Sequence, residues 1–192
     1  MGALVFGLLL FLGTHSLRIV AEDWRARQLA RLGPRRWQGL FALVAALGFV
    51  LLVWGYGQTR LDGVALWQPP LWTRHLAALL MLPALILVAA AYGPANRIRA
   101  ALGHPMLAGV KLWAFAHLLA NGRLGDVLLF GAFLLWAVLD FRAARQRDRR
   151  AGVMPAAGSV AATVLAVAAG AGVWLAFASF LHRWLIGVPV FG

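Results

Sequence analysis

The chain has 192 residues, of which 62% are hydrophobic and only 12% charged, with a mean hydropathy of +0.80 and a net charge of +12. A soluble domain is closer to half apolar and a quarter charged, so this composition excludes an ordinary soluble globular protein. No cysteine is present, which excludes a disulfide framework, a thiolate metal site and a cysteine nucleophile.

Six apolar runs follow one another along the chain. A membrane-crossing helix takes about 20 residues, and a backbone in lipid must satisfy its hydrogen bonds internally, so the runs predict helices. The predicted fold is an all-α polytopic transmembrane bundle of six helices, in a single membrane-embedded domain over residues 1–192. The runs are Ala3–Val20, Trp37–Tyr56, Trp72–Tyr92, Met106–Ala120, Leu124–Phe141 and Val160–Ile186.

Details of three runs add to this prediction. The first is not preceded by a basic segment or followed by a cleavage site, so it is expected to remain in the mature protein. The fourth is short and only three residues separate it from the fifth, which predicts a tight antiparallel hairpin. Small residues from Ala168 to Gly172 in the last run indicate close helix packing. By composition, the loop Arg142–Gly158 is the least ordered part.

Arginines are distributed unevenly among the loops, thirteen in the first, third and fifth against three in the others. Basic residues favour the cytoplasmic side of a membrane, so the odd loops are predicted to be cytoplasmic and both termini to lie outside. The positive charge therefore indicates anionic membrane lipid as the partner, and no nucleic acid. The odd-loop arginines are Arg18, Arg25, Arg27, Arg31, Arg35, Arg36, Arg97, Arg99, Arg142, Arg145, Arg147, Arg149 and Arg150.

Polar side chains within the apolar runs are the candidate functional residues, because placing them at membrane depth is costly. The five histidines are the most informative of them, since none lies in the hydrophilic loops proper. His104 sits at the cytoplasmic start of the fourth run. The residues at depth are His15, His75, Lys111, His117, Asn121, Asp126, Asp140 and His182.

Most of these candidates also have a structural interpretation. An interhelical hydrogen bond explains His15 as well as ligand binding does. His75 and His182 lie near the outer ends of their spans, where water can solvate them. Lys111 is expected to extend toward the lipid headgroups, and Asp126 to cap the start of the fifth helix.

His117 favours a ligand role. It lies one turn from Trp113 and one turn before Asn121, between the small residues Ala116 and Ala120, which leave room for a flat ligand or a close helix. Neutral imidazole is a good axial ligand for haem iron, and helix bundles build such sites from facing side chains. With no cysteine and few carboxylates at depth, a histidine site favours haem over bare zinc or di-iron.

Two motifs resemble those of the NnrU family. Residues 103–122 contain the His-Pro and Ala-His-Leu-Leu-Ala-Asn-Gly elements of its signature, and Gly13-Thr14-His15-Ser16-Leu17-Arg18 resembles its opening motif. Length and number of spans agree over essentially the whole chain. The resemblance implies a bacterial cytoplasmic (inner) membrane protein linked to denitrification, that is, to nitrite and nitric oxide metabolism. The family is also similar to zeta-carotene 15-cis isomerase, an integral membrane enzyme that uses haem b.

That similarity implies residue roles. The isomerase has a His-Pro element followed by an Ala-His element at the same spacing as His104 and His117 here, and an early His-Ser element that matches His15-Ser16. The similarity therefore implies that His15 and His117 carry the haem iron. The further cofactor-binding positions are Arg18, His104, Lys111, Trp113 and Asn121. Arginines would pair with the haem propionates: Arg18 for a haem facing the cytoplasm, and Arg74, Arg123 or Arg183 for one facing outward.

Membrane depth constrains the histidine pair. With a helix rise of roughly 1.5 Å per residue, His15 and His117 differ in depth by about 10 Å. One haem can join them if its ring tilts toward the membrane plane. If it does not, His75 or His182 is expected to replace His15.

Four functions follow from these expectations. The first is a redox-active haem b protein of the NnrU type. The second is a haem-dependent cis–trans isomerase of apolar, carotenoid-like isoprenoids. The third is a non-catalytic assembly factor for respiratory nitrogen-oxide enzymes. The fourth resembles membrane methyltransferases that carry an Arg-His-Pro motif, but Gly103 replaces that arginine and the expected downstream glutamate is missing.

Overall fold

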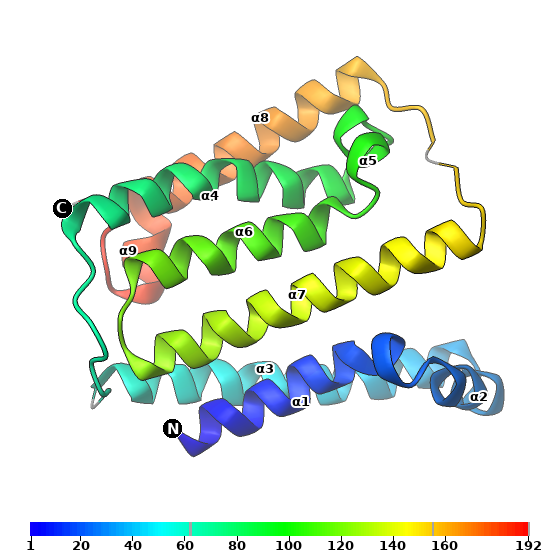
Figure 1. Ribbon diagram of the computed structural model, residues 1–192, viewed down its shortest axis with the longest axis horizontal. Coiled ribbons are helices and arrows are strands. Elements are labelled where there is room, and N and C mark those ends of the chain that lie inside the picture. Colours follow the sequence, from blue (N-terminus) through cyan, green and yellow to red (C-terminus); the bar gives the residue numbers. More distant parts are fainter. Residues whose placement is uncertain (62, 155, 192) are drawn as a thin grey trace. The chain divides into compact units, whose positions relative to one another are not determined.

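The computed structural model describes residues 1–61, 63–154 and 156–191, which form helices with two isolated β-bridges between connecting segments. Five helices are long and apolar enough to cross a membrane, and α6 is a shorter apolar helix of 16 residues. The predicted all-α polytopic fold is confirmed, while the direction in which its ends face stays a prediction. The apolar helices are α1 (Gly2–Val20), α3 (Pro34–Leu61), α4 (Leu71–Tyr92), α6 (Pro105–Ala120), α7 (Leu124–Arg150) and α8 (Val160–Ala176), the last continuing through the π-helix η1 (Phe177–Leu181) into α9 (His182–Ile186) (Figure 1).

Several helices extend beyond the apolar runs that predict them. Helix α3 starts three residues before Trp37, and α7 continues nine residues past Phe141. Two predicted loops contain further helices, α2 (Glu22–Leu32) and α5 (Arg97–Leu102). The prediction that 142–158 is the least ordered part is therefore wrong for residues 142–150, because Ala, Arg and Gln are good helix formers whatever their hydropathy. Pro155 of that loop lies outside the described residues.

Large apolar side chains cover the outward surface of the helices. On α3 they lie along most of the helix length, although buried residues occupy only a narrow stripe. Exposed apolar area of this extent marks a surface that contacts membrane or another protein, and here it indicates lipid. The exposed residues on α3 include Leu43, Leu47, Phe49, Val50 and Trp54.

The first of two compact units comprises Met1–Trp67 and Gly122–Trp136. Its core is the antiparallel contact between α1 and α3, in which glycines bring the backbones together. A Cβ added at Gly7 would lie 2.4 Å from the backbone nitrogen of Leu52, and one at Gly55 would lie 2.3 Å from that of Leu4. Close approach through small residues is the usual way in which helices associate in lipid.

The second unit comprises Gln68–Asn121 and Ala137–Gly192, with α4 lying between α6 and α8 (Figure 1). A Cβ at Gly170 would lie 2.4 Å from the Cα of Ile86, so the close packing predicted for the last run is confirmed there. The indole N–H of Trp174 adds a hydrogen bond of 2.8 Å to the carbonyl of Ala78 on α4. These contacts hold α8 on α4.

The C-terminal half of α7 belongs to the second unit and runs antiparallel to α6. Two contacts establish the direction: His104 meets Asp148, and Lys111 meets Phe141. Helix α6 also approaches α4 closely, since a Cβ added at Gly109 would lie 2.8 Å from the carbonyl oxygen of Ala84. For this half of α7, the expected antiparallel arrangement is confirmed.

Candidate functional site

His15 lies in the last third of α1, where three consecutive side chains bond to their own helix. Nδ1 of His15 donates to the carbonyl of Phe11 over 2.7 Å. The neighbouring hydroxyls of Thr14 and Ser16 donate to carbonyls four residues earlier, over 2.6 and 2.7 Å. A carbonyl only accepts hydrogen bonds, so the proton of a neutral His15 must sit on Nδ1, and Nε2 then carries the lone pair.

Aromatic rings surround His15 within the first unit. Its ring centroid lies 4.3 Å from that of Phe11, 5.2 Å from that of Phe41 and 6.0 Å from that of Trp136, the last two edge-on. The rings come from α1, α3 and α7. The indole nitrogen of Trp136 is buried and finds no hydrogen-bond partner among the described residues. The environment of His15 is therefore apolar, with one buried donor that a bound group would satisfy.

His117 repeats the arrangement of His15 in the second unit. Its Nδ1 donates to the carbonyl of Trp113 over 2.8 Å, and its ring is tilted against the indole of Trp113 at 5.4 Å. The amide of Asn121 donates in turn to the carbonyl of His117 over 2.8 Å. His117 is thus held in the same tautomer as His15. The face at the neighbouring Ala116 is filled by protein, since Ala116 is fully buried.

The structure assigns the two histidines to different units, His15 to the first and His117 to the second. Their pairing on one haem stays a prediction. Arg18 lies one turn beyond His15 with a mostly exposed side chain, 3.9 Å from a carboxylate oxygen of Glu22. It stays a candidate for a propionate on the predicted cytoplasmic side.

His104 and Lys111 take part in a polar cluster between α6 and the end of α7. Nε2 of His104 lies 2.8 Å from Oδ2 of Asp148, and the ammonium of Lys111 lies 3.6 Å from the ring centroid of Phe141. The ring of Phe141 also meets His104 edge-on at 6.2 Å. Both predicted cofactor positions therefore have protein partners, and the carboxylate occupies the nitrogen of His104 that would otherwise bind metal.

An open cleft of about 340 Å³ adjoins this cluster. Besides His104, its polar lining includes Arg99 and Asp140. Asp140 lies 3.6 Å from the guanidinium of Arg147 on the next turns of α7, and Arg99 donates to the carbonyl of Ala91. The cleft thus combines fixed charges of both signs with the apolar side chains of Tyr92, Met106 and Leu107.

Asp126 caps α7, as predicted. Its Oδ2 accepts the backbone N–H of Arg123 over 3.0 Å, the return bond of a capping box. Its Oδ1 also accepts the hydroxyl of Tyr56 from α3 over 2.8 Å. The carboxyl group is buried, with 5% of the residue exposed, so it serves the fold of the first unit.

The two substitute histidines differ from His15 and His117. His75 is exposed and stacks against Phe191, with ring centroids 6.5 Å apart. His182 donates through Nδ1 to the carbonyl of Val188 over 2.6 Å, which holds the C-terminal segment. Among the described residues, no group of three or more His, Asp or Glu converges as metal ligands would.

Asn96 is a structural residue that the sequence argument missed. It is 1% exposed, donates to the carbonyls of Ala90 and Pro94, and accepts the backbone N–H of Arg99. An asparagine before a short helix is a capping signal that could have identified it. Trp136 and Asp148 were also missed, because their partners lie on other helices and no local pattern identifies them.

Comparison with known proteins identifies one match. A family model described as NnrU protein matches residues 3–190. No curated protein and no solved structure matches the chain. The family assignment thus covers every apolar helix described above, whereas the likeness to zeta-carotene isomerase stays a prediction.

Proposed function

We infer that this chain, which belongs to the NnrU family, is a haem b-binding protein of the bacterial cytoplasmic membrane with His15 and His117 as iron ligands. One observation carries the proposal: both histidines lie in apolar helices, and both donate Nδ1–H to the carbonyl four residues earlier. An association with nitrogen-oxide respiration, and with its enzymes as partners, rests on the family resemblance.

The donor chemistry of these residues fits haem. A histidine that ligates iron is neutral, and the hydrogen bond of its second nitrogen fixes the tautomer and the ring orientation. Backbone carbonyls provide that bond for His15 and for His117. The aromatic rings around His15 supply the apolar surroundings that a porphyrin face needs, and the indole N–H of Trp136 lacks a partner that a bound group would provide.

His104, His75 and His182 fit less well. Asp148 engages Nε2 of His104, the ring nitrogen that would otherwise face the iron. His75 is exposed. His182 has its tautomer fixed by Val188, as His15 has by Phe11, so it is the stronger of the two substitutes.

Haem b would supply a redox-active iron whose axial ligands determine whether it transfers electrons or binds a further ligand. The chain's own residues do the rest. Phe11 and Trp113 provide the carbonyls that orient the imidazoles, and the aromatic side chains exclude water around His15. Arg18, one turn from His15, presents a guanidinium for a propionate.

The test is the visible spectrum of the full chain purified in detergent after expression with ample haem. We expect a Soret band that is lost or strongly weakened in His15→Gly and His117→Gly. Added imidazole should restore the band in either variant, because it replaces the missing ligand without a covalent link. The matched control is His75→Gly, which removes an exposed histidine and should leave the band unchanged.

The outcomes separate the candidate functions. A colourless wild-type protein would defeat haem binding, and its co-purification with a nitrogen-oxide enzyme would favour the assembly role. If the protein is coloured, and His15→Gly keeps the Soret band while His182→Gly loses it, then His182 is the iron ligand in place of His15.

An isomerase is the second candidate function, because an apolar groove reaches Phe41, whose ring packs against His15. Conversion of a poly-cis carotene by the coloured protein would establish it.

A further inference from the structure

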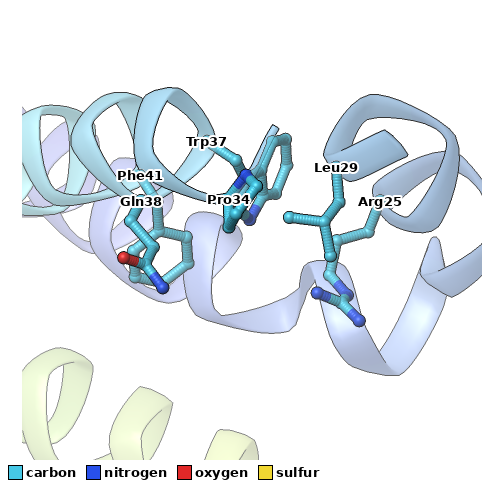
Figure 2. A pocket seen from close by; sticks show the side chains of 6 residues that line it. All are labelled: Arg25, Leu29, Pro34, Trp37, Gln38 and Phe41. Atoms are coloured by element: carbon cyan, nitrogen blue, oxygen red, sulfur yellow. The ribbon is translucent and has the colours of Figure 1, made fainter. Parts of the chain in front are cut away.

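The groove that reaches Phe41 lies between α2 and the start of α3, within the first unit. It is open on one side and has a volume of about 410 Å³. This volume lies within the range of roughly 300–1,000 Å³ for ligand sites. Figure 2 shows the side chain of Leu29 on α2 pointing toward Trp37 on α3, with the guanidinium of Arg25 beside Leu29. The lining residues are Arg25, Leu29, Pro34, Trp37, Gln38 and Phe41.

The groove is apolar along its middle and has one polar side chain toward each end (Figure 2). Leu29, Pro34, Trp37 and Phe41 form its walls, whereas Arg25 and Gln38 are the polar lining residues. Its position is interfacial, because α2 is a polar helix that follows the membrane helix α1 after one residue. Trp24 and Trp37 stack edge-on with centroids 5.9 Å apart, as expected for rings at the headgroup level.

Charge around the groove is strongly positive. Between residues 18 and 36 the chain has six arginines and two carboxylates. Such clusters beside a membrane helix attract anionic lipid. The exposed arginines on α2 and at the start of α3 are Arg27, Arg31, Arg35 and Arg36.

Arg25 is the arginine that is fixed at the groove. Its Nε and Nη2 donate to the two carboxylate oxygens of Glu22 over 2.9 and 2.7 Å, which holds the guanidinium in place. Its Nη1 is not used by this pair and is available to a further acceptor. The hydrogen bond to Glu22 raises the pKa of Arg25, so the group is cationic throughout the accessible pH range.

We propose that this groove binds one anionic phospholipid, with an acyl chain along Leu29, Trp37 and Phe41 and the phosphate at Nη1 of Arg25. An anionic lipid matches both features of the groove, its apolar walls and the arginine side chain at the level of the headgroups. The seated chain ends at Phe41, whose ring also contacts His15. The proposal does not rest on haem binding.

Native mass spectrometry of the full chain in detergent tests it, with dioleoylphosphatidylglycerol and dioleoylphosphatidylcholine as the two probes. They share acyl chains and differ in headgroup charge. We expect wild type to bind one phosphatidylglycerol at least about five-fold more tightly than phosphatidylcholine, the effect of one basic side chain at an anionic surface. Arg25→Gln should remove about that five-fold preference.

Two further variants complete the experiment. Arg27→Gln makes the same charge change on the same helix outside the groove lining and should leave the affinity within about two-fold. Leu29→Trp fills the groove without changing charge and should weaken binding of both lipids. Circular dichroism establishes that each variant keeps its helix content, so Leu29→Trp still tests the site if Arg25→Gln does not fold.

Four results would overturn the proposal. Equal losses in Arg25→Gln and Arg27→Gln would show diffuse attraction to a basic surface. Equal affinity of the two lipids in wild type would show an apolar slot without headgroup recognition. Displacement of the lipid by inorganic phosphate would show a site for free anions. A dimer that Leu29→Trp abolishes would show that a second copy of the chain covers the groove.

Discussion

Nε2 of His104 lies 2.8 Å from Oδ2 of Asp148, so the residue that precedes α6 is joined to the last turn of α7. The two side chains are 26% and 37% exposed. Solvent therefore screens the pair, and its contribution belongs in the range of partly exposed ion pairs, about 1 kcal/mol or less.

Asp148→Ala should loosen the end of α7 more than it destabilises the protein. We expect faster amide hydrogen exchange in residues 143–150, because the last turns lose their link to α6, with a loss of global stability of about 0.5–1 kcal/mol. Mass-spectrometric exchange in detergent measures both. Arg149→Ala, an exposed position one residue further, is the control, and equal exchange in the two variants would contradict the role given to Asp148.

Tyr56→Phe should destabilise the first unit. The variant removes the 2.8 Å hydrogen bond to Asp126, a buried carboxyl group that keeps only the N–H of Arg123. Leaving a buried polar group short of a partner costs about 1–3 kcal/mol, which should lower the midpoint of thermal unfolding followed by circular dichroism. Tyr92→Phe is the control, since Tyr92 is 77% exposed. Indistinguishable midpoints would refute the buried pair.

Gly7→Ala and Gly13→Ala should change stability in opposite directions. A Cβ at Gly7 would lie 2.4 Å from the backbone nitrogen of Leu52, which no side-chain rotation can relieve, whereas nothing lies within 4 Å at Gly13. Overpacking costs about 1–3 kcal/mol, and alanine in an open helical position gains up to about 1 kcal/mol over glycine. Thermal unfolding of the two variants side by side is the measurement, and a loss of equal size in both would disprove the close crossing.

Asn96→Ala should lower the free energy of unfolding by more than the loss of a helix cap alone would. The variant removes one capping acceptor and two buried donors, for which we expect about 2–3 kcal/mol. Ser159→Ala is the comparison, because its hydroxyl only caps α8 through the N–H of Ala162 and should cost about 1 kcal/mol. Equal shifts of the unfolding midpoint would mean that the bonds to Ala90 and Pro94 contribute nothing.

The apolar runs predicted the helices well where lipid contact determines hydropathy. The first run ends at Val20, as α1 does, and the third ends at Tyr92, as α4 does. Hydropathy says nothing about helix that extends into water, which is why α2 and the nine residues after Phe141 were missed. Their helical structure comes from backbone propensity, a different property of the same residues.

The candidate site could be predicted only where its geometry is local. Asp126 follows Arg123 by three residues, so its cap is visible in the sequence. The carbonyls that hold His15 and His117 lie four residues earlier on the same helix and follow from helical spacing. Trp136 meets His15 across a distance of over a hundred residues in sequence, and no pattern in one chain identifies such a partner.

The hydrogen bonds of Thr14, His15 and Ser16 to their own helix have a consequence for biogenesis. A side chain that bonds to a carbonyl of its own helix exposes less polar surface, and α1 needs no neighbour to make these bonds. The helix can therefore partition into the bilayer before α3 has been synthesised, the first stage of two-stage membrane folding. Its histidine enters the membrane already oriented by its own helix, ahead of any partner that it will later meet.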